Sequence, residues 1–362
     1  MTQDELVTIA LMRRPSYQAF LHLIAGLLLA LLAALLFEAW HSPLPWMLGP
    51  LFATATARLL HAPFRCPWQI RAAGQWAIGT VLGLYFTPSV IAILISRSSV
   101  IFFAVIFALL LGLACAWLLT RLSGITRSTA FFCMAIGGAS EMATQAERHH
   151  ARVDYVAAAH SLRLMLVVAV IPFALKFFDV HGQDAYEPAI RDVHILGLLL
   201  LIALTMCTAF VLQKMRWPNA WVIGPLLVSI GITASGLSLS ALPIWMSHAG
   251  QLFIGFSLGT HFTPSFIRGA PRFMMSVALC TIFALIVSAG FAWAISYFYN
   301  LNFATAILAT SPGGIAEMSL TAKNLELGVP IVTAFHVSRM AVLVLTIGPL
   351  FRLLKKNLSP KI

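Results

Sequence analysis

The chain has 362 residues, of which 60% are hydrophobic and only 10% are charged, and its mean hydropathy is +0.91. Because about a quarter of the residues of an ordinary soluble domain are charged, this composition excludes a soluble enzyme. The net charge of +11 does not indicate a nucleic-acid-binding module, because the Lys and Arg residues lie in short gaps between apolar runs. The whole chain is therefore expected to be a membrane domain.

Apolar runs long enough to span a bilayer recur from residue 17 to residue 353. The first run follows Arg13 and Arg14, but it is longer than the apolar region of a signal peptide and lacks a small-residue cleavage site. We therefore interpret it as the first spanning helix. In chain order, the predicted segments are 17–37, 44–60, 73–95, 99–120, 128–146, 154–175, 193–213, 219–236, 247–266, 273–298, 303–320 and 329–351.

The second half of the chain repeats the first half at an offset of 175 to 176 residues. Chance similarity between apolar runs would not preserve the glycine, proline and polar positions, so we predict two membrane repeats, residues 1–180 and 190–362. The recurring residues are Gly49-Pro50 with Gly224-Pro225, Gly74-Gln75 with Gly250-Gln251, Thr87-Pro88 with Thr263-Pro264, Gly137-Gly138 with Gly313-Gly314, Glu141 with Glu317, and His160 and Arg163 with His336 and Arg339.

The fifth segment of each half carries a helix-breaking cluster. The cluster is Gly137-Gly138 in the first half and Ser311-Pro312-Gly313-Gly314 in the second, and a glutamate follows each. Irregular backbone is tolerated at membrane depth only where it is shielded from lipid. We therefore predict a broken or re-entrant helix in both places. Thr87-Pro88 is expected to end the third helix, because a residue before proline avoids the helical conformation.

The basic residues favour an inverted arrangement of the two halves. If the fifth segments re-enter and the N-terminus lies inside, 17 of the 23 basic residues lie inside, among them Arg71 in a loop, and four lie outside. If all segments cross, 13 lie inside and 8 outside, which satisfies the positive-inside rule less well. The prediction is an all-α polytopic membrane protein with two inverted repeats, about ten crossings, two broken or re-entrant helices and both termini in the cytoplasm.

Two arginines are predicted to lie deep in the membrane. Arg163 is three residues after His160, on the same helix face, and about 13 Å into its segment at 1.5 Å per residue. His336 and Arg339 repeat this arrangement. A buried charge costs at least about 2.5 kcal/mol on insertion scales, so it normally faces a polar cavity or a partner. We interpret these residues as part of a functional cavity; the alternative is a snorkelling side chain or a structural ion pair.

Glu141 and Glu317 follow the two breaks, where a second half-helix would begin. Three roles are open: a carboxylate stabilised by the helix dipole, an ion pair with Arg163 or Arg339, or a site for a proton or cation. The amides beside each glycine pair could also bind an anion. The candidate site therefore comprises Gly137, Gly138, Glu141, His160, Arg163, Ser311, Pro312, Gly313, Gly314, Glu317, His336 and Arg339.

The sequence predicts neither a metal site nor a cofactor. The five cysteines are scattered without a C-x-x-C pair, which is typical of small buried hydrophobic residues. The run from Glu147 to His150 is more typical of a solvated loop than of a metal site.

The duplicated Gly-Gly element, the Ser311-Pro312-Gly313-Gly314 string and the arginines that follow at Arg163 and Arg339 resemble the AbrB family of bacterial inner-membrane proteins. The resemblance covers essentially the whole chain and implies a membrane duplication domain. The first half departs from the pattern, with Ala135-Ile136 in place of Ser-Pro before its glycine pair. Members of this family are labelled regulators of gene expression or ammonia monooxygenases.

The leading hypothesis is a secondary transporter, because inverted repeats, paired broken helices and midplane charges are used by such folds to build a central site. The candidate proton or ion sites are Glu141, Glu317, His160 and His336, and the candidate anion-binding residues are Arg163 and Arg339. The alternative is a membrane regulator that acts indirectly, since no recognition helix outside the membrane is predicted to bind nucleic acid. An ammonia monooxygenase fits less well, because the histidines are dispersed. The expected partners are the bilayer and a small solute or ion, with a homo-oligomer left open.

Overall fold

The computed structural model describes residues 17–42, 44–178, 192–237, 239–262 and 270–358, apart from the side chains at 140, 141, 344 and 354–358. These parts of the chain are helical and contain no strand, which confirms the all-α prediction. Predictions that concern Arg13, Arg14, Thr263-Pro264, the boundary at 180–190 and the side chain of Glu141 lie outside the described residues.

The helices follow the predicted segments closely, with additional breaks. In chain order they are α2 (Tyr17–Ala39), α3 (Pro45–Leu59), α4 (Trp68–Gly83), α5 (Pro88–Ser96), α6 (Ser98–Ser123), α7 (Arg127–Met134), α8 (Ala139–Arg148), α9 (Val153–Phe177), α10 (Ile195–Lys214), α11 (Ala220–Ala234), α12 (Ile244–Thr260), α14 (Pro271–Tyr299), α15 (Phe303–Thr310), α16 (Ile315–Asn324) and α17 (Val329–Leu358).

Several helices have the length and composition of membrane spans. In the described residues five helices qualify, and the number rises to seven if each of two bent pairs is counted as one span. Large apolar side chains on these helices face outward, as lipid contact requires; Leu32 on α2 is 65% exposed and Leu196 on α10 is 83% exposed. The protein is therefore membrane-like, whereas ten crossings and the inverted orientation stay predictions.

The third predicted segment is sharply bent. Helix α4 ends at Gly83, and α5 begins at Pro88 at an angle of 87° to it. The hydroxyl of Thr87 accepts a hydrogen bond from the amide of Val90 at the start of α5. The third helix therefore ends at Gly83, four residues before the predicted position, and Thr87-Pro88 starts the next helix in a new direction.

Both fifth segments are broken, as predicted. α7 and α8 are separated by residues 135–138, and α15 and α16 by residues 311–314. The first half-helix begins at a capping residue in both cases: Thr126 accepts from the amide of Thr129, and Asn302 accepts from the amides of Ala304 and Thr305. The second half-helix begins after a glycine in both cases, Gly138 and Gly314, so no side chain caps its start.

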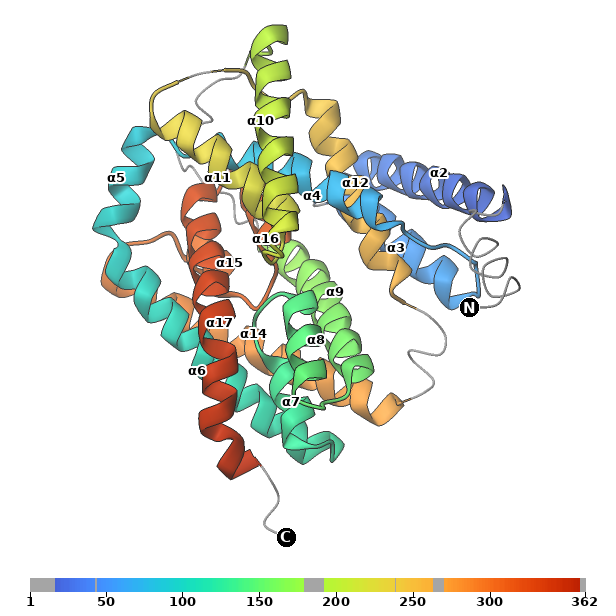
Figure 1. The fold of residues 1–362 in the computed structure, drawn as a ribbon, viewed down its shortest axis with the longest axis vertical. Helices are drawn as coiled ribbons and strands as arrows, with labels where there is room; N and C mark the ends of the chain where they lie inside the picture. Colours follow the sequence, from blue (N-terminus) through green and yellow to red (C-terminus); the bar gives the residue numbers. More distant parts are fainter. Residues whose placement is uncertain (1–16, 43, 179–191, 238, 263–269, 359–362) are drawn as a thin grey trace, which may run out of the picture.

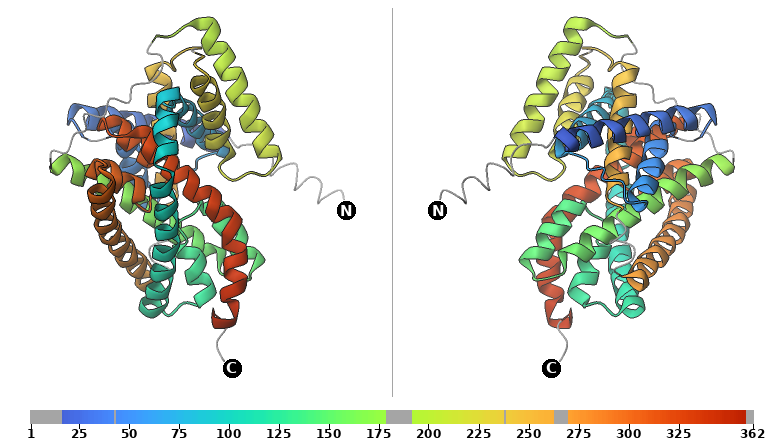
Figure 2. Two further views of the ribbon diagram at one scale, coloured as in Figure 1. Left: turned by 90° about the vertical axis from the view of Figure 1, so that its left-hand side faces the viewer. Right: turned by 90° about the vertical axis from the view of Figure 1, so that its right-hand side faces the viewer.

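The helices form two bundles, each of which contains helices from both halves of the chain (Figures 1 and 2). The first bundle consists of α2, α3 and α4 with α10, α11 and α12. The second bundle consists of α6 to α9 with α14 to α17, and α16 and α17 contact α4 across the boundary. The sequence repeats are therefore interleaved rather than folded side by side.

Close helix crossings in the first bundle depend on glycine and occur in matching pairs. A Cβ on Gly79 of α4 would collide with the carbonyl oxygen of Val222 on α11, and a Cβ on Gly255 of α12 would collide with that of Met47 on α3. Helices α4 and α12 also cross at matching glycines, Gly74 and Gly250. Small residues allow such backbone approach in membrane bundles. These close contacts of the first bundle thus occur at matching positions in the two halves.

Candidate functional site

A cavity of about 80 Å³ lies where the two bundles meet the two helix breaks. The second bundle contributes Gly137 to Ala139 from the first break and Gly313 to Glu317 from the second. A cavity measured in the same way needs a volume of about 10 to 15 Å³ to hold one water molecule. The cavity can therefore hold several waters or one small solute.

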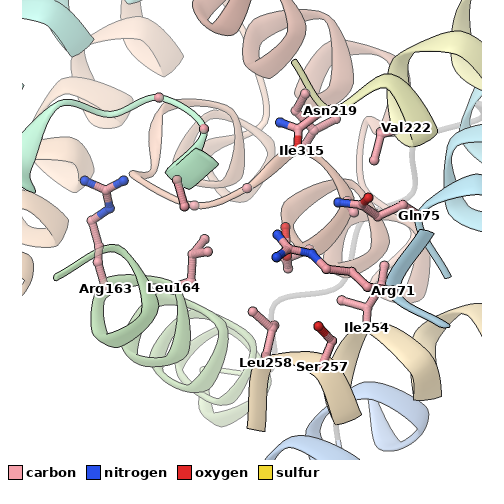
Figure 3. A pocket seen from close by; sticks show the side chains of 17 residues that line it. Arg71, Gln75, Arg163, Leu164, Asn219, Val222, Ile254, Ser257, Leu258 and Ile315 are labelled. Carbon is pink, nitrogen blue, oxygen red and sulfur yellow. The ribbon is translucent and has the colours of Figure 1, made fainter. Parts of the chain in front are cut away.

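Polar side chains of both bundles face this cavity. Figure 3 shows Arg71 and Gln75 projecting into it from α4, Ser257 from α12, and Arg163 lying on the opposite side on α9. Asn219, the residue before α11, completes the polar lining. The lining of the cavity thus combines the guanidinium of Arg71 with neutral hydrogen-bonding groups and the carboxyl group of Glu317, while Arg163 lies at its far edge.

The structure divides the predicted site residues into two groups. Those that line the cavity are Gly137, Gly138, Arg163, Gly313, Gly314 and Glu317. Those that lie behind the breaks and do not line it are His160, Ser311, Pro312, His336 and Arg339. The side chain of Glu141 is outside the described residues.

Arg339 binds the carbonyl groups that the second break leaves without helical partners. Its Nη1 donates to the oxygen of Ser311 over 2.7 Å, and its Nη2 donates to the oxygen of Gly313 over 2.6 Å. Its Nη2 also lies 2.8 Å from Nδ1 of His336, whose Nε2 is 2.9 Å from the oxygen of Leu308. A cation at the C-terminal end of α15 is also favoured by the helix dipole.

Arg163 occupies the equivalent place at the first break, with longer contacts. Its Nη1 donates to the oxygens of Met134 and Ala135 over 3.4 and 3.2 Å, and its Nη2 lies 3.0 Å from Nδ1 of His160. The Nε of Arg163 is buried without a hydrogen-bond partner among the described residues. Arg163, unlike Arg339, therefore combines support of the break with access to the cavity.

The hydrogen bonds assign one tautomer to both histidines. A guanidinium can only donate and a carbonyl oxygen can only accept. His160 and His336 must therefore accept at Nδ1 from the arginine and donate from Nε2 to the oxygens of Phe132 and Leu308. Both rings are neutral in this arrangement, and a proton could bind at Nδ1 only after the bond to arginine breaks.

Glu317 stabilises the start of α16 and does not pair with Arg339. The residue is only 8% exposed, and its Oε2 occupies the space that a Cβ on Gly314 would need. No ion pair joins it to Arg339 in the described residues, so of the three roles left open the pairing is not the one seen. The reason is that backbone carbonyls at the break satisfy the guanidinium instead. Glu317 shares the cavity lining with Arg71.

The sequence did not identify Arg71, Gln75, Asn219 and Ser257 as cavity residues. Arg71 was expected in a cytoplasmic loop, but α4 begins at Trp68 and carries it within the helix. A sequence signal for Gln75 was available, because Gly74-Gln75 recurs in the second half as Gly250-Gln251. Asn219 also connects the two bundles, because its Nδ2 lies 3.1 Å from the sulfur of Met340 on α17.

Comparisons with known proteins agree with the extent of the repeat. A family model described as "Transition state regulatory protein AbrB" matches residues 46–355. The chain is 26% identical over 339 residues to "Putative regulator AbrB" of Escherichia coli (strain K12), which covers 92% of this chain and 96% of that protein. It is 28% identical over 340 residues to "Uncharacterized protein YhjN" of Bacillus subtilis (strain 168), covering 85% of this chain and 87% of that protein.

Proposed function

This chain belongs to the AbrB family, and from that premise we propose that it is a secondary transporter whose solute site is the cavity between the two bundles. The observation that carries the proposal is that both broken helices meet at this cavity. Paired broken helices at the interface of moving parts are the usual way in which transporters build a central site. Location in the bacterial inner membrane, with both termini cytoplasmic, is part of the proposal.

The lining of the cavity favours a small anion as the solute. Arg71 forms no ion pair within the described residues, and Arg163 lies opposite it (Figure 3). The N-terminal ends of α8 and α16 add backbone amides and the positive ends of two helix dipoles. Glu317 opposes these charges, and its carboxylate is the candidate site for a coupling proton or cation.

The two His-Arg pairs serve as positioning residues in this mechanism. Each pair holds the carbonyls of one break, so that the amide-bearing start of the next half-helix stays directed at the cavity. The bundles would then move relative to each other and expose the site alternately to the two sides of the membrane.

A membrane regulator is the alternative function, supported by the name of the Escherichia coli relative, "Putative regulator AbrB". Its effect on gene expression would be indirect and would follow solute binding or solute flux. An ammonia monooxygenase requires clustered metal ligands. In the part of the chain that the structure describes, no three His, Cys, Asp or Glu side chains gather to hold a metal ion.

Uptake by the purified protein in liposomes tests the transporter proposal. Proton or sodium gradients would be imposed, with small carboxylates and inorganic anions as solutes and neutral sugars as controls. Replacing Arg71→Gln should raise KM for an anion by about tenfold or more, because a hydrogen bond to a charged group contributes roughly 1.5 to 3 kcal/mol.

The exposed Arg65 provides a matched control on the preceding loop, and Arg65→Gln should leave uptake unchanged. Uptake of neutral solutes alone, or equal KM values for the two variants, would reject the anion site. Gene-expression changes on solute addition without any uptake would favour the regulator.

A further inference from the structure

Two buried polar side chains on α12 have atoms without hydrogen-bond partners. Ser247 is 3% exposed and Gln251 is 4% exposed. The Oγ of Ser247 and the Oε1 of Gln251 have no hydrogen-bond partner among the described residues. A buried polar atom left unpaired costs free energy, so this arrangement needs a reason beyond stability.

The sequence repeat relates these two residues to the cavity. The alignment that matches Gly74-Gln75 with Gly250-Gln251 places Gln251 at the position of Gln75 and Ser247 at that of Arg71. Helices α4 and α12 cross at Gly74 and Gly250. Each helix therefore carries one polar pair at the same crossing, and only the pair on α4 lines the cavity.

Other residues of the cavity lining also have equivalents in the opposite half that do not line the cavity. Asn219, Ser257 and Leu258 line the cavity. Their equivalents, Leu44, Val81 and Leu82, are buried at 1%, 6% and 0% exposure. The glycine pairs of the two breaks correspond to each other and both line the cavity. The first bundle therefore carries two equivalent sets of residues. One set, the open wall, lines the cavity beside the breaks, and the other, the closed wall, is buried.

We infer that Ser247 and Gln251 belong to a second wall of the solute site, which faces the two breaks after the second bundle has shifted along the first. This inference rests on the proposed transport function. The unpaired atoms of Ser247 and Gln251 gain partners in that second conformation. Because a hydroxyl replaces the guanidinium of Arg71 there, a small anion binds more weakly at the second wall than at the first.

Thiol labelling with a bundle lock tests the inference on the full chain purified in detergent. Asn219 and Met340 connect the bundles over 3.1 Å, so Asn219→His with Met340→His creates a zinc site that holds the structure described here. A cysteine introduced by Ser247→Cys in a cysteine-free background is then treated with a small sulfonate-bearing thiol reagent. Zinc binding is verified by a rise in melting temperature that EDTA reverses.

Without zinc, the cysteine at 247 should react about tenfold faster or more than Cys280 does in a separate variant that keeps only this natural cysteine, although both positions are buried in this structure. Zinc should slow the reaction at 247 by about the same factor. Gln75→Cys is the matched control and should react with or without zinc, because Gln75 lines the open wall.

Two results would overturn the second wall. A cysteine at 247 as inert as Cys280 would show that Ser247 is only a core residue, whatever zinc does. Fast labelling that is unaffected by bound zinc would show local opening instead of bundle movement. Zinc-sensitive labelling, together with the absence of anion transport in liposomes by the chain without these substitutions, would uphold the second wall and reject the proposed function.

Discussion

Replacing Arg339→Met would remove the guanidinium while keeping a side chain of similar length. Three acceptors lose their donor: the oxygens of Ser311 and Gly313 and the Nδ1 of His336, at 2.7, 2.6 and 2.8 Å. Each buried unpaired acceptor costs about 1 to 3 kcal/mol. Because the variant also removes the cost of burying a charge, we expect the free energy of unfolding to fall by about 3 to 5 kcal/mol.

The equivalent change at the first break should cost less. Arg163 reaches its two carbonyls only over 3.4 and 3.2 Å, and hydrogen bonds weaken with distance. Arg163→Met should therefore lower stability by about half as much. Arg152→Met is the control, because the ion pair of Arg152 with Asp154 lies on the surface, where both side chains are 62% exposed.

Membrane abundance and thermal unfolding in detergent would rank the three variants. The expected order of melting temperatures is Arg152→Met highest, then Arg163→Met, then Arg339→Met. If Arg339→Met had the same melting temperature as Arg152→Met, the guanidinium would not be what holds the second break, and its contacts with the carbonyl groups would contribute nothing measurable. If Arg163→Met were the less stable of the two buried variants, distance would not govern these contacts.

Two further predictions concern the glutamate and the orientation. Gly314→Ala should displace the carboxylate of Glu317 from the start of α16 and reduce gradient-driven uptake. The control is Gly290→Ala on α14, where a Cβ meets nothing within 4 Å, and it should leave uptake intact. Equal uptake by both variants would remove Glu317 from the mechanism. Single cysteines replacing Thr144 and Lys323, which follow the two breaks, should react with an impermeant thiol reagent from opposite sides of the membrane, and labelling from one side only would reject inverted repeats.

Local sequence signals were sufficient for the breaks and for the His-Arg pairs. The glycine pairs disfavour a continuous helix and each is followed by a glutamate, so both broken segments could be predicted from single stretches of sequence, although Gly49-Pro50 and Gly224-Pro225 lie within the unbroken helices α3 and α11. A spacing of three residues places His160 beside Arg163 on any helix, and the structure confirms their contact at 3.0 Å.

The partners of these residues depended on tertiary structure and could not be predicted in the same way. The sequence suggested carboxylates for Arg339 because they are the visible countercharges, yet every helix break also creates unpaired carbonyls. Arg71 was misplaced because apolar windows locate the centre of a helix better than its start. The proposed second wall could not be predicted either, since Ser247 and Gln251 draw attention only once their equivalents, Arg71 and Gln75, are seen to line the cavity and their own polar atoms are seen to be unpaired.

The interleaving of the two halves constrains the order of events during synthesis. Helices α3 and α4, of 15 and 16 residues, are synthesised before the ribosome has made α11 and α12, on which they pack. Until then the glycine-bearing face of α4 at Gly79 lacks the close backbone contact that Val222 later provides. The first bundle consequently cannot be completed until translation of the second half is well advanced, and a prematurely ended chain would present the cell's membrane proteases with unpaired short helices.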